Sequence, residues 1–169
     1  GAAAVGTRIF FAPENEDTIG VLDTTTSIFS AIDISSFSVA NAKYRGAAAV
    51  GTRVFFGPLS ENNVGVLDTT TNTFSIIDIS AFSTGVAKYS SAVAVGTSVY
   101  FAPFVEDNVG VLDTTTNTFS TIALAAGVTG GSKYQGAVAV GTRVFFVPYS
   151  LYVENVGVLD TTTSIFSII

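Results

Sequence analysis

The residues able to do chemistry in this 169-residue chain are carboxylates, lysines and tyrosines, because the sequence contains no His and no Cys. His is the commonest general base and metal ligand near neutral pH, and Cys supplies the thiolate nucleophile. No serine lies in a nucleophile-elbow context, and no glycine-rich phosphate loop joins a strand to a helix. Catalysis is therefore the function that the residues support least, and we expect no cofactor.

Acidic side chains occur in two patterns. One aspartate per repeat precedes a run of threonines: Asp23, Asp68, Asp113 and Asp160. We expect these carboxylates to cap turns by accepting backbone N–H groups. The second pattern is a local cluster of Glu14, Glu16 and Asp17, which is a weak candidate for a metal site, since Ca²⁺ needs about six to eight oxygens at one point. The alternative is that these loop carboxylates are solvated.

The elements that must position these residues come from one unit written four times. Val5-Gly6-Thr7 recurs at 50–52, 95–97 and 140–142. A fixed period of about 45 residues indicates a solenoid, a propeller or an array. We expect a single domain over 1–169, with the repeats 1–45, 46–90, 91–135 and 136–169.

The second repeat shows the expected strands most clearly, at 46–50, 53–56, 64–67 and 73–79. We refer to them as strands a, b, c and d of a meander. Apolar residues are consecutive in strands b and c, and consecutive residues point to opposite faces of a sheet. Both faces must therefore be covered, which the radial packing of blades provides. The sequence predicts an all-β protein, a β-propeller of four-stranded antiparallel blades, with a β-solenoid as the alternative.

The unit resembles the YVTN-type and kelch-like β-propeller repeats. The resemblance rests on the aromatic b strand at 52–56, a polar loop, and the valine-rich c strand with its Asp-Thr-Thr-Thr-Asn turn at 64–74, and on the lead-in that starts at Lys88-Tyr89. It covers all four repeats. The sequence departs from kelch repeats in having no Gly-Gly pair after strand b and no Trp. The resemblance implies the fold rather than the function, since propellers host enzymes, lectins and scaffolds alike.

Both ends of the chain fall at the same joint, the connection from strand d to strand a, and the chain contains no Met. We interpret these features as signs of a cut from a larger propeller. The alternative is that four blades close a small ring, at the low end of the usual range of about four to eight.

The composition limits the partners. A net charge of −6, with seven basic residues spread over the repeats, argues against nucleic acid, whose binders need clustered Lys and Arg. No stretch approaches the roughly 18 apolar residues of a membrane helix, so we expect no membrane span. A chain without Cys fits oxidising and reducing compartments alike. The acidic composition slightly favours an extracellular location.

The loops predict the binding face. The b–c loops at 13–17, 58–63, 103–108 and 148–155 vary, whereas the a–b and c–d turns are nearly identical. Binding residues are concentrated in variable loops held by a rigid scaffold. The third and fourth b–c loops carry the expected partner-binding residues: Phe104, Val105, Tyr149, Leu151 and Tyr152.

The Lys-Tyr pairs that enter strand a from the same face are the second candidate. A polar ligand at the mouth of the channel would meet six residues: Lys43, Tyr44, Lys88, Tyr89, Lys133 and Tyr134. The alternative is that they anchor the linkers, with the ring packed and the ammonium facing water or a carboxylate.

These observations predict a non-catalytic scaffold or accessory subunit that binds a protein partner, or joins a larger assembly, through its b–c loop face. The alternatives are an extracellular propeller that binds a glycan or small ligand, and a fragment of a propeller enzyme.

Overall fold

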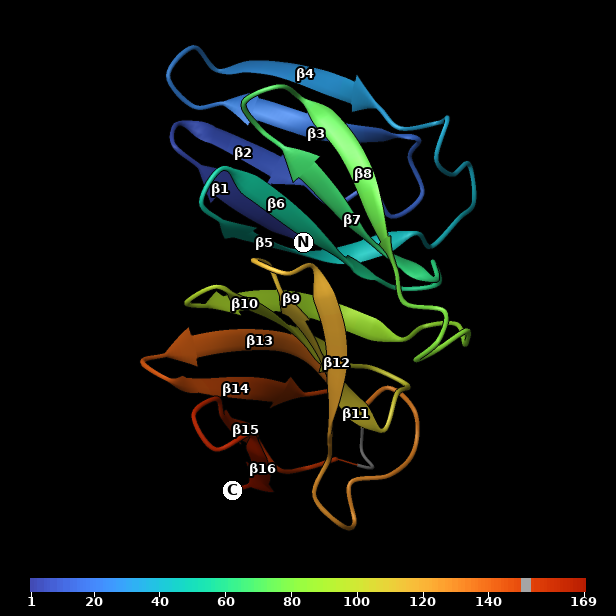
Figure 1. Cartoon of the computed structure of the whole chain (residues 1–169), viewed down its shortest axis with the longest axis vertical. Coiled ribbons are helices and arrows are strands. Elements are labelled where there is room, and N and C mark those ends of the chain that lie inside the picture. Colours follow the sequence, from blue (N-terminus) through green and yellow to red (C-terminus); the bar gives the residue numbers. More distant parts are fainter. Residues whose placement is uncertain (150–152) are drawn as a thin grey trace.

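The protein is built only from strands and loops in the residues that the computed structural model describes, 1–149 and 153–169 (Figure 1). The strands form four separate four-stranded antiparallel sheets, each a meander in chain order. This is the predicted β-propeller architecture, with one blade per repeat. Within the described ranges there is no helix long and apolar enough to cross a membrane.

Each blade contains strands a to d of one repeat. Blade one consists of β1 (Ala2–Val5), β2 (Arg8–Phe11), β3 (Thr18–Asp23) and β4 (Ile28–Asp33). Blade two consists of β5 (Tyr44–Val50), β6 (Arg53–Pro58), β7 (Asn63–Asp68) and β8 (Thr73–Asp78). Blade three consists of β9 (Tyr89–Val95), β10 (Ser98–Pro103), β11 (Asn108–Asp113) and β12 (Thr118–Ala123). Blade four consists of β13 (Tyr134–Val140), β14 (Arg143–Pro148), β15 (Gly157–Asp160) and β16 (Ile165–Ile168).

The four strands predicted in the second repeat are confirmed, and each differs from its predicted bounds by one or two residues. Strand β6 runs through Pro58 rather than stopping before it. Pro58 is the last residue of the strand and pairs with Tyr44, a position at which a missing N–H is tolerated.

The short turns lie together on one face of the molecule, as predicted. Each a–b turn is a two-residue hairpin that begins with a glycine at positive φ, for example +61° at Gly51. The backbone N–H of Thr69, in the c–d turn of blade two, donates to the Thr52 carbonyl of the a–b turn at 2.9 Å. The same bond recurs in the other three blades.

The turn aspartates act as caps. In blade two the Asp68 carboxylate accepts the backbone N–H of Thr70 at 2.8 Å and its hydroxyl at 2.6 Å. These bonds, the hydroxyl first, hold the pKa of Asp68 below its ordinary value. Asp23, Asp113 and Asp160 make the same bonds and have pKa values lowered by the same cause.

The hydrophobic core lies between the blades. We call the face of a sheet that packs on the preceding blade its leading face, and the face that packs on the following blade its trailing face. Between blades one and two, Phe10 and Ile19 of the trailing face meet Tyr44, Phe56 and Phe74 of the leading face. The interfaces between blades two and three and between blades three and four use the same positions. Three equivalent cores therefore hold the four sheets together.

Glycine lets the inner strands and the aromatic layer approach closely. A Cβ on Gly46 of β5 would lie 2.6 Å from the Ser91 Cα of β9. A Cβ on Gly110 of β11 would lie 2.8 Å from Cζ of Phe119 and 2.9 Å from Cζ of Tyr89. These positions set how tightly consecutive blades and their aromatic side chains pack.

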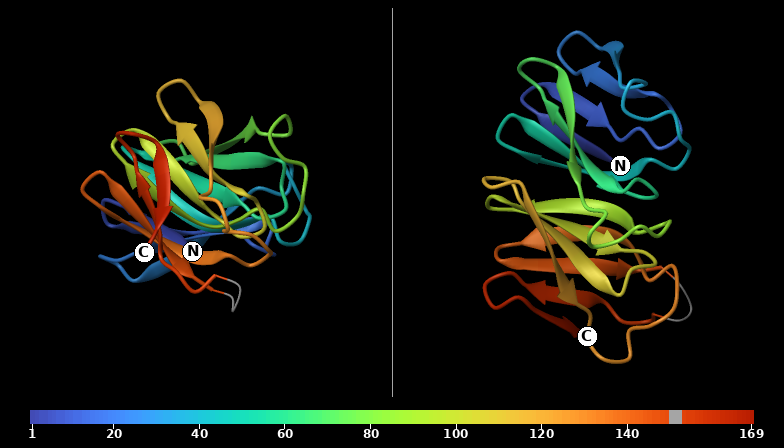
Figure 2. Two further views of the ribbon diagram at one scale, coloured as in Figure 1. Left: turned by 90° about the horizontal axis from the view of Figure 1, so that it is seen from below. Right: turned by 45° about the vertical axis from the view of Figure 1, so that its right-hand side comes forward.

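The blades follow one another in chain order from one end of the molecule to the other (Figures 1 and 2). The inner strands of all four blades line one cavity, so the sheets form an arc around it. The arc is open, because Phe29 on the leading face of blade one is 64% exposed and Val140 on the trailing face of blade four is 65% exposed. Among the described residues, blades one and four do not pack against each other through these two faces.

Replacing Gly110 with Ala tests the close packing of the aromatic layer. The new methyl group would overlap Phe119 and Tyr89, which are both buried, so we expect the free energy of unfolding to fall by about 1–3 kcal/mol. The matched control is Gly20→Ala in blade one, whose Cβ would lie 2.8 Å from Cζ of the exposed Phe29. That ring can turn away. Urea unfolding of both variants checks this; equal losses would contradict it.

The turn caps predict a loss of stability in acid. Because the folded-state pKa values of the turn aspartates are lowered, their contribution is fully present above the ordinary Asp pKa of about 4 and is lost as pH falls through the lower folded value. The double variant Asp68→Asn/Asp113→Asn keeps an acceptor oxygen but does not titrate there. We therefore expect the urea midpoint of this variant to fall less between pH 5 and pH 2, roughly the window of Asp titration. Identical pH profiles would show that these caps do not carry the acid sensitivity.

Candidate functional site

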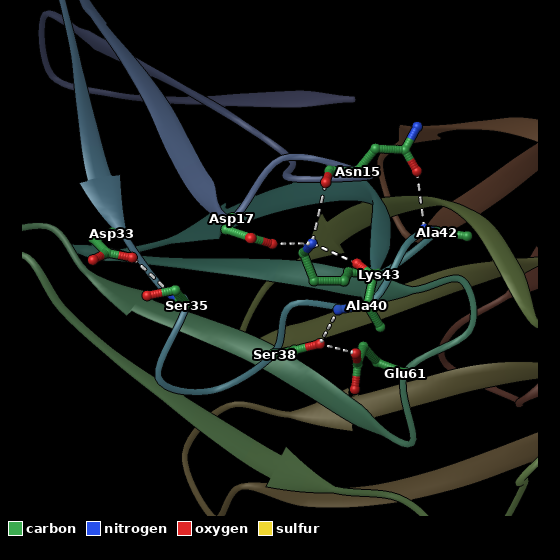
Figure 3. Close-up of polar contacts among 9 residues, drawn as sticks. All are labelled: Asn15, Asp17, Asp33, Ser35, Ser38, Ala40, Ala42, Lys43 and Glu61. Carbon is green, nitrogen blue, oxygen red and sulfur yellow. Dashed lines mark hydrogen bonds and ion pairs between the residues drawn. The ribbon is translucent and has the colours of Figure 1, made fainter.

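The Lys-Tyr pairs tie each blade to the b–c loop of the blade before it. Lys43 is fully buried, and its ammonium donates to Asp17 Oδ1 at 2.9 Å and to the Ala40 carbonyl at 2.6 Å (Figure 3). Nearby, the Ser38 hydroxyl donates to Glu61 Oε1 at 2.5 Å. The linker into blade two is thus fastened to the b–c loops of both blade one and blade two.

The other two lysines repeat this arrangement with different acceptors. Lys133 is fully buried and donates to the Val105 carbonyl at 2.7 Å and to Asp107 Oδ1 at 2.8 Å. Lys88 is also fully buried and donates to the carbonyls of Ser60 and Glu61 at 3.1 and 3.0 Å. Burial lowers the pKa of Lys88, because it disfavours the charged form.

The tyrosines pack under the aromatic residues of their own blades. Tyr44 and Tyr89 direct their hydroxyls at the amide oxygens of Asn63 and Asn108, the second at 2.7 Å. Burial raises the pKa of both phenols above the usual Tyr range. Among the described residues the Tyr134 hydroxyl has no partner. In the fourth repeat a two-residue insertion moves the matching asparagine along the chain to position 155.

A ligand could reach the six Lys-Tyr residues only if the linkers moved. Their ammonium and ring groups point into the protein, between a linker and the preceding loop. The arrangement therefore favours the anchor interpretation over the ligand-binding one.

A different residue of each linker faces the cavity. The register of strand a shifts after Tyr44, Tyr89 and Tyr134, which leaves Arg45, Ser90 and Gln135 as the bulged positions. A β-bulge inserts one residue and redirects its side chain. All three residues line the central cavity. Every other position nearby is Gly, Ala or Ser, apart from Val147, so the bulges supply the chemical variety of the lining.

The cavity is of a size that suits ligands or side chains. Its volume is about 640 Å³, inside the range of about 300–1,000 Å³ typical of ligand pockets. Ser90 is buried, and its hydroxyl donates a hydrogen bond to the Tyr134 carbonyl at 2.6 Å. This hydrogen bond joins the inner strands of blades three and four in the wall of the cavity. Gln135 is exposed, and Arg45 is half-buried. These two long polar side chains are the groups that can meet a bound molecule.

Side chains from all four blades converge beside Arg45. Its guanidinium donates to the Glu14 carboxylate at 2.7 Å and lies 5.7 Å from the ring centre of Phe104. Phe104 in turn packs against Tyr149, with 5.7 Å between ring centres. The guanidinium lowers the pKa of Glu14 by hydrogen bonding. We call these four residues the loop cluster: Glu14, Arg45, Phe104 and Tyr149.

The structure brings together two of the five predicted partner-binding residues. Phe104 and Tyr149 belong to the loop cluster, and Tyr149 is 53% exposed. Val105 is exposed on the same loop as Phe104, while its carbonyl receives the Lys133 bond. Leu151 and Tyr152 lie outside the described residues.

The three carboxylates considered for a metal site do not act as one cluster, because two of them form ion pairs with different basic residues. Glu14 is paired with Arg45, Asp17 with Lys43, and Glu16 is exposed. In the ranges that the structure describes, no three acidic side chains gather as a cation would require. Solvation and ion pairing account for these loop carboxylates.

Sequence reasoning missed Arg45 and Gln135. The signal was present, because the residue after each Lys-Tyr pair is Arg, Ser or Gln in an otherwise near-identical unit. That these residues occupy a bulge, and so face the cavity, depends on the pairing of strands a and b. The sequence pattern alone does not show that shift.

Comparison with known proteins identifies the fold. No protein family and no curated protein matches the sequence. Among solved structures, Kuenenia stuttgartiensis hydrazine synthase is similar, with a TM-score of 0.73 and 13% identity over 99% of this chain and 48% of that one.

The extracellular domain of a proposed one-component system from B. thetaiotaomicron is also similar, with a TM-score of 0.70 and 10% identity over 99% of this chain and 21% of that one. A hybrid two-component system domain from the same organism gives 0.68 and 11%, over 98% of this chain and 21% of that one. The chain thus spans about half or a fifth of the proteins it matches. At these identities the likeness shows the fold alone.

Replacing Lys133 with Met tests the anchor role of the lysines. The apolar side chain fills the same space but leaves the Val105 carbonyl without its buried donor, so we expect a loss of about 1–3 kcal/mol in the free energy of unfolding. Glu16→Gln, a change at an exposed charge, is the control and should stay within about 0.5 kcal/mol. A Lys133→Met variant as stable as the control would remove the anchor role.

Proposed function

We propose that this protein is a non-catalytic β-propeller module, a scaffold or accessory subunit, that binds a protein partner through its b–c loop face. The observation that carries the proposal is the loop cluster, in which four blades contribute to one patch. We propose further that the repeat belongs to the YVTN-type and kelch-like group, on the strength of the strand and turn motifs described above.

The composition of the loop cluster supports a protein partner. Aromatic residues and Arg are enriched at the centres of protein interfaces, where they supply most of the binding energy. Phe104 and Tyr149 offer rings, while Arg45 offers a guanidinium that an aromatic ring and a carboxylate already orient. Because these contacts already orient the side chains of the loop cluster, ordering them on binding would cost little free energy.

The position of the loop cluster adds to this support. Arg45 belongs both to the cluster and to the lining of the cavity, so the exposed patch and the cavity are continuous. A partner loop could rest on Phe104 and Tyr149 and extend a side chain toward Gln135. The lysine anchors hold the loops that carry the rings.

Peptide selection from a displayed random library tests this function. Peptides that bind the wild-type protein should lose at least roughly fivefold in affinity on Phe104→Ala and on Tyr149→Ala, as expected for central interface residues that cost more than about 1 kcal/mol. The control is Thr70→Glu, in an exposed turn on the opposite face. If Thr70→Glu weakened peptide binding while Phe104→Ala and Tyr149→Ala did not, the peptides would bind the turn face. That result would contradict the proposal.

A glycan or small polar ligand is the second candidate, and the cavity favours it. Its lining includes the side chains of Gln135, Ser91 and Arg45, which can hydrogen-bond hydroxyl groups. A glycan array separates the two candidates. Glycan binding that Gln135→Ala abolishes, with no peptide selected by the wild-type protein, would replace the protein partner by a glycan.

A further inference from the structure

The two ends of the arc expose faces that are buried everywhere else in the molecule. On the trailing face of blade four, Val138 and Val147 are 54% and 53% exposed. The matching residues of earlier blades, Ala48 and Ala102, are 6% and 0% exposed because the next blade covers them. An apolar face of this kind is a candidate interaction surface.

The leading face of blade one is open in the complementary way. Phe11 is 39% exposed and Phe29 is 64% exposed. The residues matching Phe29 in the other blades are almost fully buried, at 6% for Phe74 and 4% for Phe119. In the part of the chain that the structure describes, both halves of the contact that is made three times between consecutive blades are thus also present uncovered.

A hydrogen bond from an arginine, repeated between consecutive blades, is also missing at the two end faces of the described arc. Arg8 of blade one donates to the Thr69 carbonyl in the c–d turn of blade two, and Arg53 of blade two donates to the Thr114 carbonyl in blade three. Thr69 and Thr114 are each 2% exposed. The matching Thr24 of blade one is exposed, since the structure offers it no preceding blade.

Blade four presents the other half of this contact. The guanidinium of Arg143 lies 5.1 Å from the ring centre of Phe145, as that of Arg8 lies 5.1 Å from that of Phe10. It is therefore held in the position from which Arg8 and Arg53 reach the next turn. In the described part of the chain no c–d turn accepts a hydrogen bond from it.

The inner strand of blade four also keeps the space that a neighbour needs. A Cβ on Gly46 would collide with the next inner strand, at 2.6 Å from the Ser91 Cα. Gly136 is the matching glycine of β13, and a Cβ there would lie 3.4 Å from Val147 of its own blade. Among the residues that the structure describes, no atom of another blade lies within 4 Å of that Cβ position.

We propose that a second copy of this chain occupies these faces, with the leading face of blade one in each copy seated on the trailing face of blade four in the other. The contact continues the blade-to-blade interface already present, and both of its halves are on one chain. Two copies related by a two-fold axis make this contact twice, which closes a ring. Two copies would give eight blades, at the upper end of the usual range of about four to eight.

Multi-angle light scattering across a concentration series tests the second copy. The expected mass is twice the chain's 17.4 kDa. Ala4→Glu on the leading face and Val140→Glu on the trailing face each place a carboxylate in the proposed contact, and both positions are exposed in the single chain, so neither variant should unfold it. Each should weaken self-association by at least roughly tenfold. Ser75→Glu, the same change on an exposed position of β8, is the control and should leave the mass unchanged.

Mixing the two variants makes the test specific for a leading-to-trailing contact. In a mixed pair, one contact receives both carboxylates and the other receives none. An equimolar mixture should therefore recover a two-chain species that neither variant forms alone. A wild-type chain that stays monomeric up to about 0.5 mM, far above the micromolar range of ordinary affinities, would overturn the proposal. So would association that either variant leaves intact, or that mixing fails to restore.

Discussion

Every sheet of this protein is apolar on both faces, and the rest of the structure depends on covering them. Val54, Phe55 and Phe56 are consecutive in one strand, point alternately to opposite faces, and are all fully buried. An isolated blade would leave both of its faces, and so all three of these side chains, in contact with water, at a cost of about 25 cal/mol for each Å² of apolar surface. No blade is therefore a self-sufficient unit. The stability of each depends on the trailing face before it and the leading face after it.

Polar contacts fix how the covered sheets are aligned. A buried ammonium is costly unless hydrogen bonds and countercharges compensate it. Lys43 and Lys133 each donate to a carboxylate and to at least one carbonyl, whereas among the described residues Lys88 donates to two carbonyls. Because each lysine joins a linker to the preceding b–c loop, these bonds also hold the loops. The apolar layers give the blades cohesion, and the lysines give the loop face its shape.

Departures from the repeat occur at one interface between blades and in the lining of the cavity. Ser98 replaces the arginine of blade three, and Ser164 replaces the asparagine that accepts from that arginine in the next turn of the earlier blades. The two changes thus fall on facing positions of one interface. Arg45 and Gln135 differ at a bulge that faces the cavity. The repeated residues build the scaffold, and the unrepeated ones make this interface and the cavity lining chemically distinct.

The sequence by itself determined the blades, because the 45-residue period, the turn glycines and the Asp-Thr-Thr-Thr turns act locally. Hydrogen bonds within a turn and alternation along a strand need no distant partner, so strand order, turn faces and aspartate caps were all predictable. The loop cluster was predictable only in part. Phe104 and Tyr149 were identified as loop aromatics, but their convergence with Glu14 and Arg45 joins four blades distant in sequence. Only the tertiary structure decided that the Lys-Tyr pairs are buried, that the bulges face the cavity and that the arc is open. These features depend on how neighbouring sheets pack, and the sequence of one repeat does not show that packing.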